Sequence, residues 1–314
     1  MKILSRIGAL AFAALAACQS PVTTESPGPV PAPEAVADAS AAPDGGERQV
    51  RPALWKVSDE DTTIYMLGTV HILPPGIEWF DGRIETAFNS SQLLVTEIAG
   101  GDPLTMQALV MDKAMLGDGQ TLRGLLSDKE RADYEAALAA MGIPLATFDR
   151  FDPWYASVGL STLPLMREGF DGKNGVEEFL HARAGQRGLA QEGLETAEYQ
   201  LSIFDSLPLE VQKNYLFEII AELPTIGTQI KVMIEAWKSG NADELARLMN
   251  SGQSDPVLID RLLTSRNKAW ARWIDERLEQ PGTVFLAVGA GHLAGEASLQ
   301  DQLAAAGIAS QRLQ

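Results

Sequence analysis

Two of the three histidines in this 314-residue chain come three positions after a glycine, at the end of an apolar run. MLGTVH contains Gly68 and His71, and LAVGAGH contains Gly289 and His292. Apolar runs of this length are typical of buried strands, and a glycine there permits a close backbone approach. Ligand sites form at the carboxyl ends of strands in open α/β sheets. The pattern is equally compatible with one site shared by both imidazoles and with two hydrogen-bonded structural histidines.

A carboxylate follows a third apolar run of the same kind. QLLVTEI carries Glu97, which would point into the same region if its strand pairs beside the strand that carries Gly68. Two imidazoles and a carboxylate suit a divalent ion such as Mn, Co, Fe or Zn, which can generate hydroxide near neutral pH. The third histidine, His181, stands beside Glu177 and Glu178 in a helical pattern, and we expect an exposed or satisfied helix residue.

Several other chemistries are excluded or disfavoured by the sequence. Cys18 is the single cysteine, and no Gly-x-Ser-x-Gly elbow, phosphate-binding loop or His-Glu-x-x-His helix is present. A mature fold without cysteine excludes disulfides, thiolate zinc sites and a cysteine nucleophile. The net charge of −17 disfavours nucleic acid and anionic lipid surfaces as partners.

The N-terminus has the pattern of a bacterial lipoprotein. Residues 1–17 combine a basic start with a short apolar core, and Leu-Ala-Ala-Cys places Cys18 at the lipidation position. A plain secreted protein is the alternative. Residues 18–49 are rich in Pro and Ala and are expected to form a flexible tether. The expected location is the bacterial cell envelope, facing the periplasm, with Gln19 favouring the outer membrane.

The folded part, residues 50–314, is expected to have strands at both ends and helices between them. ALWKV and TTIYMLGTV flank the turn SDED as a hairpin, and QLLVTEI, TVFLAVGAGH and IASQRLQ are further strands. Between about 150 and 280 the apolar spacing is helical, apart from the strand-like LAQEGLET. This order predicts an α/β (α+β) domain, with a central mixed β-sheet built from the N- and C-terminal segments and a large helical insert.

The ordered set of segments resembles the TraB/GumN family, which includes the Tiki metalloproteases. The resemblance covers residues 52–314 and is closest to bacterial GumN-like members, which are often envelope proteins. It implies a fold related to the erythromycin esterase-like and ChaN-like proteins. The chain departs from many relatives at Glu177, where they have Asp. The matching segments are LWKV, IYMLGTVH, LLVTEI, RFDPWYAS, GVEEFLHARAGQRG, GLETAEYQL, AWKSGNADEL, RLLTSRNKAWARWI and FLAVGAGHLAGEASL.

The resemblance also implies roles for individual residues. In Tiki proteins the paired Gly-x-x-His motifs and acidic residues carry metal-dependent proteolysis, so the histidines of both motifs here would be metal ligands. Glu97 or Glu195 would be the third ligand, and the other would be the general base, although Glu195 could instead interact with a helix dipole. Arg266 would clamp a substrate or stabilise an oxyanion, or form a buried ion pair. Asn267 completes the matching Arg-Asn pair.

Three functions follow as hypotheses from the residues and the resemblance. The first is a metal-dependent envelope hydrolase, most simply a peptidase, with a divalent cofactor such as Mn, Co or Zn. The second is a non-enzymatic protein that binds a peptide or another partner in the same cleft. The third is a metal-independent, esterase-like hydrolase in which one histidine is the general base. The expected partners are a peptide or small-molecule substrate and, through the acyl anchor alone, a membrane; the oligomeric state stays open.

Overall fold

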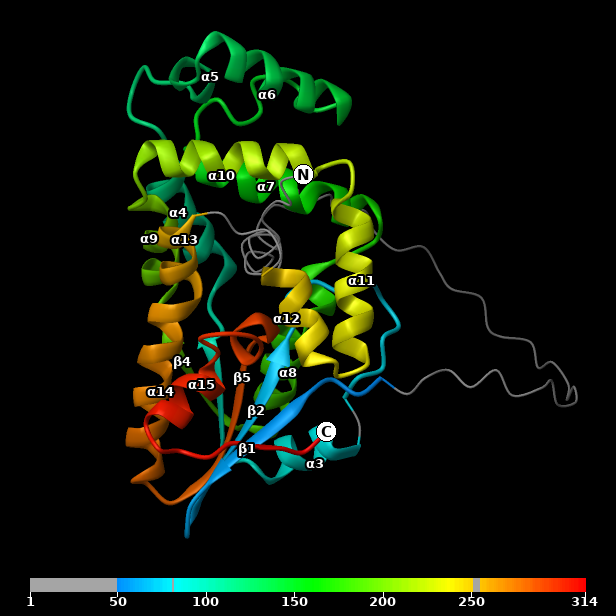
Figure 1. The fold of residues 1–314 in the computed structure, drawn as a ribbon, viewed down its shortest axis with the longest axis vertical. Coiled ribbons are helices and arrows are strands. Elements are labelled where there is room, and N and C mark those ends of the chain that lie inside the picture. Colours follow the sequence, from blue (N-terminus) through cyan, green and yellow to red (C-terminus); the bar gives the residue numbers. More distant parts are fainter. Residues whose placement is uncertain (1–49, 81, 251–254) are drawn as a thin grey trace, which may run out of the picture.

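The computed structural model describes residues 50–80, 82–250 and 255–314 (Figure 1). The predicted signal peptide, the lipidation residue Cys18 and the tether lie outside these residues. Within the described part, no helix combines the length and the apolar character needed to cross a membrane.

A six-stranded mixed sheet forms the base of the molecule, in the order β4-β3-β5-β2-β1-β6. β1 is antiparallel to both of its neighbours, whereas β2, β5, β3 and β4 run parallel to one another. The mixed α/β architecture predicted from the sequence is therefore confirmed. The strands are β1 (Leu54–Ser58), β2 (Thr62–Thr69), β3 (Leu93–Ile98), β4 (Ala190–Glu195), β5 (Gly282–Gly289) and β6 (Gln311–Arg312).

The pairing differs from the expectation at one point that matters for the site. β3 does not pair beside β2, because β5 lies between them. The parallel register aligns Thr69 at the end of β2 with Gly289 at the end of β5. The carboxyl ends of β2, β5 and β3 therefore share one edge of the sheet, which still brings His71 and Glu97 together, now on either side of Gly289.

The central strand β5 is buried on both faces, as expected for a parallel strand covered by helices. Alternate side chains join different cores. Val284, Leu286 and Val288 belong to a cluster on the face covered by α14 and α15, and Phe285 and Ala287 belong to the larger core on the opposite side. This double burial holds the end of β5 rigidly, together with the loop that carries His292.

Helices form most of the chain between β3 and β5, as predicted. The exception is β4, which arises inside this insert and adds an edge strand parallel to β3. The helices are α3 (Gly82–Ser90), α4 (Pro103–Ala114), α5 (Leu122–Leu125), α6 (Asp128–Ala140), α7 (Pro153–Arg167), α8 (Val176–Arg187), α9 (Ala197–Asp205), α10 (Leu209–Glu222), α11 (Ile226–Lys238), α12 (Ala242–Asn250), α13 (Pro256–Ile259), α14 (Ser265–Leu278) and α15 (Leu299–Ala305), with short segments η2 (Gly172–Asn174), η3 (Asp260–Thr264) and η4 (Ala290–Leu293).

Local sequence signals explain several of these boundaries. Ser127 and Glu130 form a capping box at the start of α6, and Gly142, with φ 65°, follows the end of that helix. A different feature precedes α14: η3 is a π-helical turn that leads directly into Ser265. Such turns change the direction in which the following side chains point and are frequent at functional sites. Arg266 and Asn267 come immediately after this turn.

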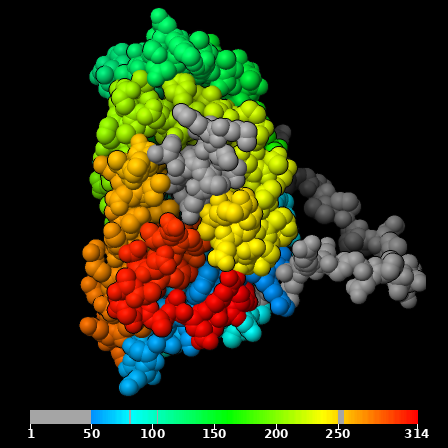
Figure 2. Space-filling model, viewed as in Figure 1, coloured from blue at the N-terminus to red at the C-terminus, as the bar shows by residue number. Residues whose placement is uncertain are grey.

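Figure 2 shows how the C-terminal segment completes the fold on one face. The red segment lies between the orange helices α13 and α14 and the yellow helix α12. α15 contacts α14, and η4, which carries His292, contacts α12. The loop after β5 is therefore held between helices from the insert, which sets the position of His292.

Candidate functional site

A cavity of about 30 Å³ lies where β2 and β5 end. This volume is enough for a water molecule or an ion. One side is polar and is formed by Thr69, His71, Glu97 and His292, together with backbone at Gly289 and Gly291. The other side is apolar and comes from the helical insert: Met233, Ile234, Leu245, Met249, Leu262 and Leu263. The cavity thus lies between the sheet edge and the side chains of α11, α12 and η3.

Three potential donor groups converge around Gly289. A Cβ at this position would lie 3.0 Å from Glu97 Oε1, 3.6 Å from His292 Cδ2 and 3.8 Å from His71 Nε2. The space that a side chain would fill is therefore the space that the carboxylate and the two imidazoles face. Gly289 also donates its backbone N–H to Glu97 Oε1 at 2.7 Å. Glycine is required here for the approach of these side chains rather than for an unusual backbone angle.

His292 is buried, with 4% of its surface exposed, and both of its ring nitrogens are occupied. Its Nδ1 lies 2.7 Å from Asn267 Oδ1, and Asn267 Nδ2 donates to the Ala297 carbonyl, which fixes the amide orientation. Nδ1 must therefore carry the proton, and Nε2 accepts a hydrogen bond from Arg266 Nη1 at 3.1 Å. His292 is held as one neutral tautomer.

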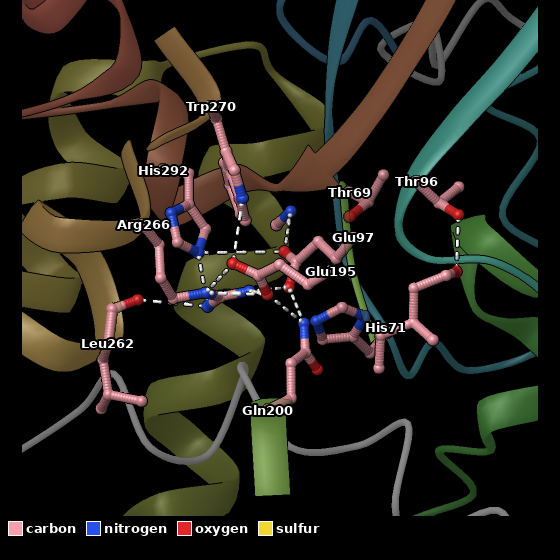
Figure 3. Close-up of polar contacts among 12 residues, drawn as sticks. Thr69, His71, Thr96, Glu97, Glu195, Gln200, Leu262, Arg266, Trp270 and His292 are labelled. Carbon is pink, nitrogen blue, oxygen red and sulfur yellow. Dashed lines mark hydrogen bonds and ion pairs between the residues drawn. The ribbon is translucent and has the colours of Figure 1, made fainter. Parts of the chain in front are cut away.

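Arg266, only 3% exposed, is the centre of the polar network in Figure 3. Each of its five N–H donors has an acceptor. Nε and Nη2 donate to Glu195, Nη2 also donates to Glu97 Oε2 at 2.5 Å, and Nη1 donates to His292 and to the Leu262 carbonyl. The Leu262 carbonyl belongs to the π-helical turn η3, so the local backbone helps to aim the guanidinium. Arg266 therefore bridges β3, β4 and η4 as a buried ion-pair partner.

The two carboxylates paired with Arg266 have different surroundings. Glu195 accepts hydrogen bonds from Trp270 Nε1 at 2.9 Å and Gln200 Nε2 at 3.0 Å, in addition to those from Arg266, and it does not line the cavity. Glu97 shares Gln200 Nε2 at 3.0 Å but turns Oε1 toward the cavity, 3.8 Å from His292 Nε2. Glu97 is therefore the carboxylate available to a bound group, and Glu195 holds Arg266.

His71 lies on the opposite side of Glu97 from Arg266 and is held differently (Figure 3). Its Nδ1 pairs with Glu177 Oε1 at 2.7 Å, and Thr69 donates its hydroxyl to the same oxygen. His71 Nε2 makes no hydrogen bond to the described residues, and it faces the cavity. A histidine oriented through Nδ1 by a carboxylate, with Nε2 free, is the usual arrangement of a ligating or acid–base imidazole.

The surroundings drive the two histidine pKa values in opposite directions. For His71, burial lowers the pKa, but the charge and hydrogen bond of Glu177 and the charge of Glu97 more than offset it and raise the pKa to about 9. For His292, burial and the adjacent Arg266 charge lower the pKa to about 3. Burial would raise the pKa of Glu97, yet the charges of Arg266 and His71 and the hydrogen bond from the Gly289 N–H hold it well below its usual range. At neutral pH the site therefore holds a cationic His71, a neutral His292 and an ionised Glu97.

The side chains that line the cavity match a divalent metal ion in the kind of donor atoms they carry. His71 Nε2 and Glu97 Oε1 face the volume at Gly289, whereas His292 turns its Cδ2 carbon toward it; imidazole nitrogen and carboxylate oxygen are donors that Mn, Co and Zn accept. The spacing is not yet that of a bound ion: within the described residues, no three His, Cys, Asp or Glu side chains are assembled around a metal-sized point. The contact between Arg266 and His292 Nε2 is one reason, because it uses the lone pair that a metal would need.

Among the described residues, the structure brings together those singled out from the sequence, apart from His181 and Gly68, whose carbonyl accepts a hydrogen bond from Trp237 outside the cavity. His181 lies on α8 with Nδ1 2.7 Å from Gln191 Oε1, outside the cavity. Three contributors were not assigned a role beforehand: Glu177, Gln200 and Trp270. The sequence shows Glu177 as a neighbour of His181 and as a departure from relatives, and neither feature indicates its contact with His71. Gln200 and Trp270 lie in two of the segments that match the family, but their residue types and spacing do not distinguish them from ordinary helix residues.

The chain is similar in sequence to known proteins over most of its length. The sequence model of the TraB/PrgY/gumN family matches residues 53–312, which include every residue of the network. An uncharacterized protein of Treponema pallidum (strain Nichols) is 24% identical over 263 residues, or 79% of this chain and 78% of that protein. No solved structure matches the chain. The chain belongs to the TraB/PrgY/gumN family.

Proposed function

We propose that this protein is a metal-dependent hydrolase, with a peptide as the favoured substrate, that works in the bacterial cell envelope. The supporting observation is the convergence of His71 Nε2, His292 and Glu97 Oε1 on the volume above Gly289. The proposal includes lipid anchoring at Cys18, which lies outside the described residues. A bound divalent ion would supply the positive charge that polarises a scissile carbonyl and lowers the pKa of water.

The chain's own residues would orient this chemistry. Glu177 orients His71 so that its Nε2 faces the cavity, and Asn267 fixes the His292 tautomer so that Nε2, now the acceptor of a hydrogen bond from Arg266, is the nitrogen with the lone pair. Glu97 would be the third ligand, because Glu195 is turned away and fully hydrogen-bonded. The apolar side chains of α11 and α12 exclude bulk water, which strengthens electrostatic interactions at the sheet edge.

A second candidate is metal-independent hydrolysis by the pair of His71 and Glu177. It is favoured by the free Nε2 of His71 and the 2.7 Å contact to Glu177. Because the pKa of His71 is raised to about 9, this imidazole would be protonated at neutral pH and would act there as a general acid rather than a base. Turnover that survives complete chelation would support this candidate over the metal-dependent one.

Elemental analysis of the purified protein tests the proposal, with the double variant His71→Ala/His292→Ala beside the wild type and His181→Ala as the matched control. We expect close to one equivalent of Mn, Co or Zn in the wild type and in the control, and loss of this metal in the double variant. Peptide-library cleavage that follows the same pattern would support the hydrolase. Equal metal content in all three proteins would refute the site, and metal-free wild type after refilling would favour the binding-protein hypothesis.

A further inference from the structure

The lone pair of His292 Nε2 is already in use. A neutral imidazole has one acceptor nitrogen, and the contact of Nδ1 with Asn267 Oδ1 makes Nε2 that acceptor. Arg266 Nη1 donates to it at 3.1 Å. One lone pair cannot serve both a guanidinium and a metal ion. Any metal bound through His292 must therefore displace Arg266 Nη1.

Arg266 can give up this contact without leaving its place. Its Nε and Nη2 are anchored on Glu195 at 2.8–3.1 Å, and Nη1 has the Leu262 carbonyl as a second acceptor. Glu195 in turn is held by Trp270 and Gln200. A small rotation of the guanidinium would release Nε2 while the anchor on Glu195 stays. The same cation also neutralises Glu97 in the metal-free protein, through the 2.5 Å contact of Nη2.

We infer that Arg266 is an internal competitor of the metal ion and sets the metal affinity of the site. This inference rests on the proposed function. The guanidinium of Arg266 places its positive charge between Glu97 and His292, where a metal ion would place its own. A metal ion can therefore bind His292 only if the contact between Arg266 and His292 is lost. The site should therefore bind metal more weakly than its donor set alone would, and respond to metal concentration rather than hold an ion permanently.

The test compares zinc affinity in the full chain and in two charge-conserving variants. Arg266→Lys keeps one positive charge but loses the planar fork that reaches Glu195 and His292 at once. Arg247→Lys is the matched control, because Arg247 is exposed and pairs only with Glu244 within the described residues. Titration against a chelating dye should give Arg266→Lys a zinc affinity about tenfold higher than wild type, the effect of one hydrogen bond to a charged group. Arg247→Lys should be unchanged.

A measurement on the wild type covers the case in which Arg266→Lys does not fold. In arginine-¹⁵N-labelled protein, the guanidinium of Arg266 should give slowly exchanging signals, because all five donors are engaged. Zinc should shift its Nη1 signal and speed its exchange, in step with changes at the histidine rings. Zinc bound with unchanged Arg266 signals, or with equal affinity in Arg266→Lys, would overturn the inference alone. Absence of zinc binding in wild type and variant alike would overturn the proposed function and this inference with it.

Discussion

The two Gly-x-x-His ends of the sheet have the same sequence pattern but opposite chemistry. His71 has one nitrogen on Glu177 and the other free toward the cavity, and its pKa is raised to about 9. His292 has both nitrogens occupied, by Asn267 and Arg266, and its pKa is lowered to about 3. The difference arises from the helices that approach each end, α8 at the first and α14 at the second. A short motif therefore fixes where a histidine lies, and the insert fixes its protonation state.

The two ends of the sheet also differ in whether they contribute mainly to stability or to reactivity. The His292 end is tied into a buried network that joins β3, β4 and α14, whereas the His71 end has a charged imidazole with a free nitrogen. We call the His292 end closed, because both ring nitrogens are occupied, and the His71 end open, because Nε2 is free. Substitutions at the closed end should therefore act mainly on folding, and substitutions at the open end mainly on ligand binding and on the pH dependence of stability.

The largest effect on folding is expected from Arg266→Ala. The substitution leaves Glu97 and Glu195 buried without their counter-ion, and removing one partner of a buried ion pair lowers the free energy of unfolding by about 3–5 kcal/mol. Urea unfolding would measure this loss. Arg247→Ala, at an exposed ion pair, should lower it by less than about 1 kcal/mol. Similar values for both variants would contradict a closed network around His292.

The next largest effect is on the pH dependence of the free energy of unfolding, measured in protein kept metal-free by a chelator. His71 and His292 should contribute to this dependence with opposite signs. In the folded protein the pKa of His71 is about 9, above its ordinary 6.5. Its contribution to the free energy of unfolding is therefore fully present below pH 6.5 and is lost as pH rises through 9. The size is on the order of 3 kcal/mol or less. Glu177→Gln should flatten this alkaline loss in unfolding measurements between pH 6 and 10.

For His292 the sign is reversed. Its folded pKa of about 3 lies below 6.5, so the unfolded chain takes up the proton first and stability falls as pH drops from 6.5 toward 3. His292→Gln should reduce this acid loss and leave the alkaline limb unchanged. An acid limb that is the same in wild type and variant would show that His292 is not held neutral.

A smaller loss of stability is expected when the hydrogen bond that fixes the tautomer of His292 is removed. Asn267→Ala removes the acceptor for Nδ1 and the donor to Ala297, and leaving such buried groups unsatisfied costs about 1–3 kcal/mol. His181→Ala, the corresponding change outside the site, should alter the free energy of unfolding by about 0.5 kcal/mol or less. Thermal and urea unfolding of both variants would check this order.

Much of the fold and part of the site could be read from the sequence. Apolar runs that end in glycine located β2 and β5, and the shared edge of parallel strands brought their histidines together with Glu97. The insertion of β5 between β2 and β3 could not be predicted, because that pairing joins segments about 190 residues apart and leaves no local signal. The same reason applies to Gln200 and Trp270, whose roles depend on how α9 and α14 pack.

Protonation states were also beyond the sequence. Arg266 and Glu195 were singled out through the family resemblance, but only the structure shows that the guanidinium contacts His292 Nε2 and that Glu195 is turned from the cavity. Glu177 became relevant once α8 was seen to place it on His71. A motif of two residue types could not distinguish the open end from the closed one.

The most direct test of this account is the long-range ¹H–¹⁵N spectrum of the histidine rings, recorded against pH in metal-free protein and then with added zinc. We expect the ring of His71 to stay doubly protonated to about pH 8, and the ring of His292 to stay neutral, with its proton on Nδ1, down to about pH 4. Zinc should then shift both of these rings together and leave His181 unchanged. Two site histidines that titrate together near pH 6.5, or zinc that shifts only one of them, would contradict it.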